Sequence, residues 1–151
     1  MLRLTTFAFA LTLAGQGFAQ SHSHGNHGDG AARTPAPENA MAYIISPADG
    51  ATVSNPVTIL FGARGIGIAP ANVEWPNTGH HHLLINVDTA EIDLDLGLPA
   101  DDQHRHFGGG QTQVTLELPA GTHTLRLLMG DHNHVPHMPP ILSKPVTITV
   151  Q

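Results

Sequence analysis

The stretch NTGHHHLLINVD, residues 77–88, decides the fold. From the histidines onward, apolar side chains recur at every second position, which is the period of a β-strand with one face in a core. The positions that share this face are His81, Leu83, Ile85 and Val87. Such a strand needs partners to bury its apolar face, so we expect the rest of the chain to supply strands of the same pattern.

The same period of two recurs along the chain after Met41. The other expected strands are residues 43–45, 57–61, 114–118, 123–129 and 146–150. Glycine, proline, asparagine and aspartate separate them, and the mature chain has no convincing helical period. A length of 151 residues suits one domain. These features predict an all-β fold over residues 41–151, an immunoglobulin-like antiparallel β-sandwich of about six to eight short strands.

Composition excludes several classes of function. The formal net charge of −6 argues against a nucleic-acid-binding surface. The chain has no cysteine, which excludes disulfides, iron–sulfur clusters, thiolate zinc sites and cysteine nucleophiles. Histidine is instead abundant, with 12 residues against 6 lysines and arginines together. Any chemistry of this protein is therefore expected to involve imidazole, whose charge changes at about pH 6.5.

Residues 1–19 have the pattern of a secretory signal peptide. Arg3 supplies the positive charge, residues 4–14 form an apolar run, and Gly17-Phe18-Ala19 provides a small-x-small cleavage site. The apolar run is too short to anchor the chain in a bilayer. We therefore expect a periplasmic or secreted protein without a membrane span after cleavage.

Residues 20–40, QSHSHGNHGDGAARTPAPENA, are expected to form a disordered tail. Its histidines, His22, His24 and His27, belong either to a weak metal-capturing segment or to a solvated linker. Cleavage after Ala19 would place His22 third from a free amine, an arrangement that binds Cu(II) or Ni(II) in a square plane. Cyclisation of Gln20 would abolish that site.

The nine histidines of the domain fall in four places. They are His80–His82, His104 and His106, His123, and the group His132, His134 and His137. Loops of a β-sandwich gather at its ends, so side chains distant in sequence meet there. Imidazole suits copper, zinc and nickel. The pairs expected to bind a metal ion are His80 with His82, His104 with His106, and His134 with His137.

Each of the other candidate residues near these pairs could either take part in metal binding or have a purely structural role. His81 and His123 lie on apolar strand faces, where a buried neutral ring bonded to a carbonyl is expected, although either ring could orient metal ligands. His132 is expected to be solvated. Asp102, next to Asp101, is either a ligand or an orienting group, or else a solvated loop acid. The Met138 thioether is a further candidate, for Cu(I).

Three segments resemble one family. They are NTGHHHLLIN (77–86), LPADDQHRHFGGGQT (98–112) and LPAGTHTLRLLMGDHNHVPHMPP (118–140), and they are similar to the main blocks of the bacterial exported domain of unknown function 4399. The resemblance covers residues 42–150 and leaves out the tail. It implies a single compact β domain behind a signal peptide, without an established activity. The histidines that it includes are His80, His81, His82, His104, His106, His123, His134 and His137; His132 is not among them.

Three functions remain open at this point. The first is a periplasmic metal-binding protein for capture, delivery or detoxification, with copper ahead of zinc because imidazole-only ligands suit Cu(II) in an oxidising compartment. The second is an interaction module that binds an envelope protein partner, with structural histidines. The third and least favoured is a metal-dependent enzyme, since no G-x-S-x-G or H-E-x-x-H motif is present and no catalytic residue is assigned.

Overall fold

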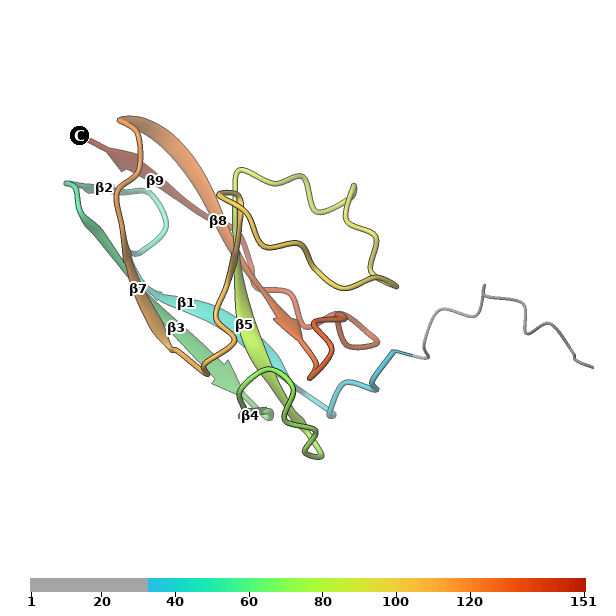
Figure 1. Cartoon of the computed structure of the whole chain (residues 1–151). Helices are drawn as coiled ribbons and strands as arrows, with labels where there is room; N and C mark the ends of the chain where they lie inside the picture. Colours follow the sequence, from blue (N-terminus) through green and yellow to red (C-terminus); the bar gives the residue numbers. More distant parts are fainter. Residues whose placement is uncertain (1–32) are drawn as a thin grey trace, which may run out of the picture.

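The structure, a computed structural model, describes residues 33–151 (Figure 1). This part of the chain contains strands and no helix, so no helix in it is long and apolar enough to cross a membrane. The strands are β1 (Met41–Ser46), β2 (Ala51–Val53), β3 (Val57–Arg64), β4 (Gly67–Ile68), β5 (Thr78–Ile85), β6 (His104–His106), β7 (Gln113–Leu116), β8 (Gly121–Gly130) and β9 (Val146–Val150). The expected signal peptide and His22, His24 and His27 lie outside the described residues.

Two sheets pack face to face in the all-β sandwich that the alternating pattern predicts. The smaller sheet has the order β1-β3-β7, and the larger has the order β2-β9-β8-β5-β4, with β6 paired to β5. The pairings are antiparallel except β2 with β9 and β4 with β5, which are parallel. The expected six to eight strands become nine because β2, β4 and β6 have only two or three residues each, too few to show a period in the sequence.

The core between the sheets is built from the alternating positions. Leu83 on β5 lies opposite Leu127 on β8, and both are fully buried. From the other sheet, Ile59 and Phe61 pack into the same core. Burial of these side chains is the main source of stability for the two sheets, because each fully buried Leu or Ile contributes about 1.5–3 kcal/mol relative to an exposed one.

Strand β5 ends earlier than the expected strand, whose alternating pattern runs over residues 81–88. Ile85 is its last residue, and Asn86 follows with φ of 58°. The Asn86 side chain accepts a hydrogen bond from the Thr124 backbone N–H at 2.9 Å, which holds this turn of the chain against β8. A left-handed conformation breaks the β pattern, and asparagine adopts it more readily than most residues, so Val87 continues into a loop instead of the strand.

The outer face of β5 and β8 is also covered. Figure 1 shows the connections after β5 and after β8 on the side of these strands that faces away from β1, β3 and β7. Leu98 from the first connection packs with Leu84 and Leu128 in a second, smaller apolar cluster. Strand β5 is therefore buried on both faces, and residues 79–85 are all buried.

The ordered domain begins before the expected boundary at residue 41. Residues 33–40 belong to the described structure, and Pro35 forms a bridge with Met138. The Ala36 N–H donates to the Met138 carbonyl at 2.8 Å, and the Met138 N–H donates to the Thr34 carbonyl at 2.9 Å. Residues 33–40 of the expected disordered tail are therefore ordered. Local composition did not indicate this, because the backbone hydrogen bonds that hold them are made to a distant segment.

Leu127 tests the core. We expect Leu127→Ala to lower the free energy of unfolding by about 2–5 kcal/mol, because its side chain is fully buried and a cavity would remain. Ile45→Ala is the control, since Ile45 is 56% exposed. Urea unfolding measures both, and similar losses for the two variants would contradict this description of the core.

Candidate metal centre

Three imidazoles meet on the outer face of the larger sheet. His80 and His82 come from β5, and His106 comes from β6, where it lies opposite His82 in the register of the two strands. One ring nitrogen from each lies within 4.8 Å of the others. In the part of the chain that the structure describes, this is the one group of three or more histidine or acidic side chains close enough to share a metal ion.

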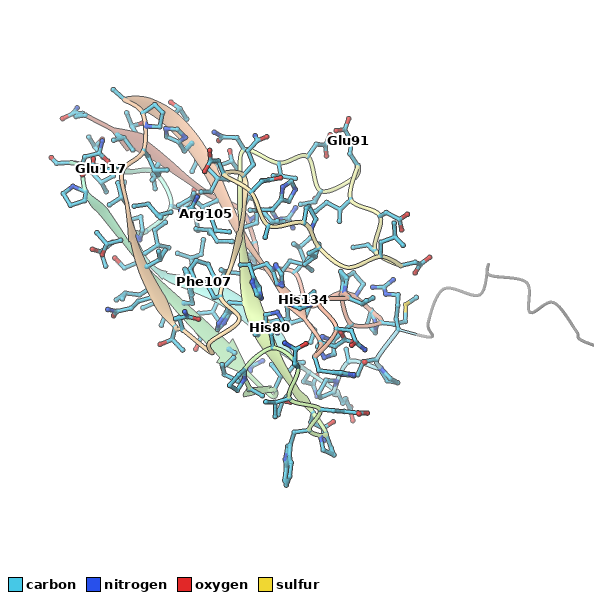
Figure 2. The ribbon with its side chains drawn as sticks, in the orientation of Figure 1. His80, Glu91, Arg105, Phe107, Glu117 and His134 are labelled. Carbon is cyan, nitrogen blue, oxygen red and sulfur yellow. The ribbon has the colours of Figure 1, made fainter. Side chains whose placement is uncertain are left out.

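A fourth ring, His134, stands against these three. Its ring centroid is 5.1 Å from that of His80 and 4.7 Å from that of His106. Figure 2 shows His134 beside His80, next to β5. His134 comes from the loop after β8 and has φ of 69°. The site thus combines two neighbouring strands with a loop that lies far along the chain from β5.

The other expected ligands lie elsewhere. His137 is fully buried, and its ring nitrogens face the Thr78 carbonyl at 3.2 Å and the Met129 carbonyl at 3.5 Å. It is therefore held by backbone groups and is not a member of the group of three rings. Met138 is 52% exposed, in contrast to the fully buried His80 and His82.

His81 and His123 have the buried, carbonyl-bonded environments expected of them. His81 points into the core, with its ring 5.3 Å from that of Phe61 and its Nδ1 3.3 Å from the Gln111 carbonyl. The Nε2 of His123 lies 2.8 Å from the Pro119 carbonyl, and its Nδ1 lies 3.0 Å from the Asn86 side-chain amide. Neither ring belongs to the group of three.

His104 and Asp102 lie at the edge of the site. His104 shares a face of β6 with His106, two residues away, but its ring is bound by the Asp101 carboxylate. Asp102 is exposed and pairs with Arg105 at 2.9 Å. His132 is half-buried and bonds to the neighbouring Asn133 side chain, so it is less solvated than expected and does not join the group.

Two glycines leave room for the rings. A Cβ on Gly130 would lie 2.9 Å from the His82 Nε2, and a Cβ on Gly108 would lie 2.6 Å from the His106 Nε2. Real Cβ atoms do not approach other heavy atoms so closely, so a side chain at either position would displace an imidazole. Glycine is therefore required here by space, and the backbone of β8 can lie directly against the His82 ring.

Asp131 fixes the loop that carries His134. One carboxylate oxygen accepts backbone N–H bonds from Asn133 at 2.8 Å and Val135 at 3.0 Å. The other accepts the Thr34 hydroxyl at 2.6 Å. Burial raises the pKa of Asp131, but the hydrogen bonds together lower it by more. The pKa therefore lies below its usual value. Sequence reasoning missed both Asp131 and Thr34; an Asx turn at Asp131-His132-Asn133 is the one local signal that points to the carboxylate.

The segment before β1 closes the same loop from outside. The Arg33 side chain is nearly buried, and its guanidinium donates to the Pro136 carbonyl at 2.9 Å and to the His137 carbonyl. Together with the Thr34–Asp131 bond, these contacts hold residues 33–36 across residues 131–138. We call residues 33–36 the amino-terminal strap. Its role was missed because neither residue type nor spacing indicates a contact with a segment so far along the chain.

The environment keeps the rings of His80, His82 and His106 neutral. Burial, followed by the nearby His106 and His134 rings, lowers the pKa of His80 to about 4. Burial, followed by the neighbouring His80, lowers the pKa of His82 to about 2. Burial also lowers the pKa of His106, with a further contribution from His134. At neutral pH the rings therefore offer lone pairs rather than positive charge, which is the form that binds a metal ion.

The group has unsatisfied polar atoms. The His80 Nδ1, the His82 Nδ1 and the His106 Nε2 are buried without a hydrogen-bond partner. Each such atom costs about 1–3 kcal/mol. His81 has one as well, in the core, so an orphaned nitrogen does not by itself identify a metal site. The convergence of three such rings does distinguish this group from a set of packed core side chains.

The lowered pKa values predict the pH dependence of stability without metal. Below about pH 6.5 the unfolded chain binds protons at His80 and His82 that the folded chain does not, so stability falls as the pH drops towards about 4, and further towards about 2. Urea unfolding in the presence of a chelator measures this. H80Q/H82Q should show a flatter dependence than the wild type; equal slopes between about pH 7 and pH 5 would be inconsistent with neutral buried rings.

The amino-terminal strap gives a second prediction. Thr34→Val removes the hydroxyl that bonds to the Asp131 carboxylate, and we expect a loss of about 1–2 kcal/mol in the free energy of unfolding. Thr58→Val is the matched control, because its hydroxyl bonds only to the exposed Thr115 hydroxyl. An effect of Thr34→Val no larger than that of the control would show that the strap does not support the loop.

Comparison with known protein families finds a match that covers most of this domain. Residues 59–151 match the family described as Domain of unknown function (DUF4399), and this range includes every histidine of the group and the loop with His134. No curated protein and no solved structure matches the chain. Since the match covers more than half of the sequence, the chain belongs to the DUF4399 family.

Proposed function

We propose that this protein is an exported metal-binding protein whose site is formed by His80, His82, His106 and His134, with copper as the first candidate ion and zinc as the second. The observation that carries the proposal is the convergence of three neutral imidazoles within 4.8 Å, two of them fully buried and the third, His106, partly exposed. A structural role alone is a poor explanation for this arrangement, because apolar side chains would fill the same space without leaving polar atoms unsatisfied.

The distances fit a metal ion. Two nitrogens bound to one ion at about 2.0–2.1 Å lie about 2.9 Å apart at a right angle and about 3.3 Å apart at the tetrahedral angle. The Nε2 atoms of His80 and His82 are 3.0 Å apart. The ring nitrogens of the three histidines lie within 4.8 Å of one another, and opposite ligands of one ion lie about 4.1 Å apart, so the rings would have to move by less than about 1 Å.

The chemistry of the donor set favours copper over zinc. Copper(II) binds most tightly among the divalent first-row metals to a given nitrogen site. The chain has no cysteine, so thiolate ligands, which many structural zinc sites use, are absent from the sequence. Imidazole ligands without thiolate also tolerate an oxidising compartment, in agreement with the export expected from residues 1–19. The biological role under this proposal is capture, delivery or detoxification of the ion.

A second function is supported by a different surface. On the edge strand β1, Met41, Tyr43 and Ile45 are all exposed by more than two-fifths of their area. An exposed apolar row is a common feature of protein–protein interfaces. If the histidine group binds no metal, an interaction module for an envelope protein becomes the better proposal.

Metal titration of the full chain tests the proposal. In every sample the tail histidines are replaced (H22Q, H24Q, H27Q), so that only the domain can bind Cu²⁺ or Zn²⁺. We expect about one Cu²⁺ per chain and a rise in the melting temperature, because an ion that binds only the folded state stabilises it. H80Q/H82Q should weaken binding by about a hundredfold or more, since it removes two of the proposed ligands.

His132 provides the matched control for this titration, because H132Q is also a histidine-to-glutamine change but lies outside the group. The H132Q variant should bind the ion with the same affinity as the tail-substituted chain. H106Q, on a short strand at the edge of the sheet, replaces the double variant if the latter does not fold. Absence of binding to the tail-substituted chain, or equal affinity in H80Q/H82Q and H132Q, would overturn the proposal.

A further inference from the structure

The group of histidines is poorly accessible. His80 and His82 are fully buried, beneath the connections that follow β5 and β8. His106 is the partly exposed member of the group of three. It lines an open hollow of about 390 Å³ together with residues 100–102, His104 and Arg105. Through this hollow an ion from solvent would meet His106 without displacing the connections that cover β5.

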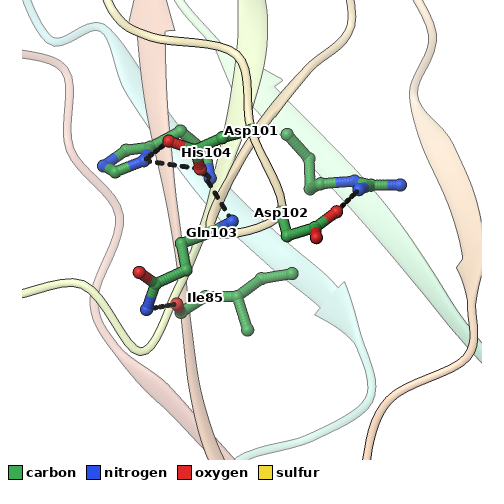
Figure 3. Close-up of polar contacts among 6 residues, drawn as sticks. Ile85, Asp101, Asp102, Gln103 and His104 are labelled. Carbon is green, nitrogen blue, oxygen red and sulfur yellow. Dashed lines mark hydrogen bonds and ion pairs between the residues drawn. The ribbon is translucent and has the colours of Figure 1, made fainter.

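His104 stands in this hollow in a fixed orientation. Its Nδ1 lies 2.9 Å and 3.1 Å from the two carboxylate oxygens of Asp101 (Figure 3). The same carboxylate accepts the backbone N–H groups of His104 and Gln103, each at 2.8 Å, so it is itself held in place. A neutral ring that donates its Nδ1–H to a carboxylate keeps the lone pair on Nε2, and the carboxylate raises the affinity of that lone pair for a metal ion.

His104 also lies close to the buried group along β6. It lies two residues before His106 on β6, on the same face of the strand, at a spacing of about 6.5–7 Å. Its partner across the register is Leu84, the next position on this face of β5 after His82. The ring is close enough to affect His82 electrostatically. An ion bound by His104 would thus lie beside His106, the next side chain on the same face of β6.

We propose that His104, oriented by Asp101, is the capture ligand of this site: it binds the incoming ion first and passes it to His106 and the buried rings. This inference rests on the proposed function of the group. The position explains why a carboxylate-bound histidine lies near the metal centre without belonging to it. Asp102 adds a second carboxylate to the hollow, although its pairing with Arg105 at 2.9 Å offsets its charge.

A capture ligand has a kinetic signature. It lowers the barrier between solvent and the site in both directions, so its loss slows association and dissociation together and leaves the dissociation constant unchanged. A ligand of the bound state behaves differently, since its loss speeds dissociation and weakens equilibrium binding. Rate measurements therefore separate the two roles, which a titration alone does not.

Stopped-flow loading with Cu²⁺ and with Zn²⁺ tests the proposal on the full chain with H22Q, H24Q and H27Q. We expect H104Q to slow association about tenfold, within the range by which local fields and ligands accelerate binding, while chelator competition gives an unchanged dissociation constant. Asp101→Asn should have a smaller effect in the same direction, because it weakens the orientation of His104. H132Q is the control and should load at the rate of the parent chain.

The outcomes distinguish this inference from the proposed function. If the parent chain binds neither ion, the proposed function fails, and this inference fails with it. If the parent chain binds the ion but H104Q loads at the same rate, only the role of His104 is overturned. If H104Q weakens equilibrium binding and speeds dissociation, His104 is a ligand of the bound state, and the capture role is likewise wrong. Asp101→Asn provides the same comparison if H104Q does not fold.

Discussion

The pairing of β5 with β8 is the constraint on which the rest of this structure depends. It places Leu83 opposite Leu127 in the core and, on the reverse face, His82 opposite Leu128. In an ordinary sandwich the reverse face would meet water. Here the two long connections cover it, and the histidines of β5 are buried with the leucines beside them. The protein thus places polar rings in an apolar setting, where their lone pairs stay free of protons.

The cost of that burial bears on the function. A buried imidazole without a partner destabilises the fold, and the group concentrates several such atoms at one point. Proteins tolerate destabilising arrangements chiefly at functional sites. An ion bound at the Nε2 atoms of His80 and His82 would stabilise the folded state and offset part of this cost, so metal binding and folding would be coupled in this domain. Gly108 and Gly130 make this arrangement possible, because the His106 and His82 rings occupy the space that a side chain at these two positions would need.

Support for the group comes from segments that are remote in sequence. Asp131 shapes the loop that carries His134, and Thr34 in the amino-terminal strap holds Asp131 in turn. On the opposite edge Asp101 orients His104. His134 and His104 therefore each have a carboxylate nearby that fixes the loop or the ring, whereas the buried His80 and His82 are fixed by the strand itself. Rigid central rings and anchored outer ones are the arrangement that a preorganised metal site, as proposed for this group, would require.

The sequence by itself determined the class of fold and the inner face of the sheet. Alternation of apolar residues depends only on the strand period, so this period is enough to assign His81 to the core and to separate it from His80 and His82. The sequence also determined that imidazole, and not thiolate, is available. The two-residue and three-residue strands were not predicted, because they are too short to repeat the pattern twice and their pairing depends on neighbours across the sheet.

Only the tertiary structure decided which histidines meet. Their place in one loop paired His134 with His137. The His134 ring, from a left-handed backbone position, instead lies against the rings of β5 and β6, while the His137 ring faces the carbonyls of Thr78 and Met129. Spacing likewise treated His104 as the equal of His106, although a carboxylate three residues earlier holds its ring apart from the group. Local sequence carries the periodicity of a strand, but the direction of a loop side chain depends on contacts from segments far along the chain.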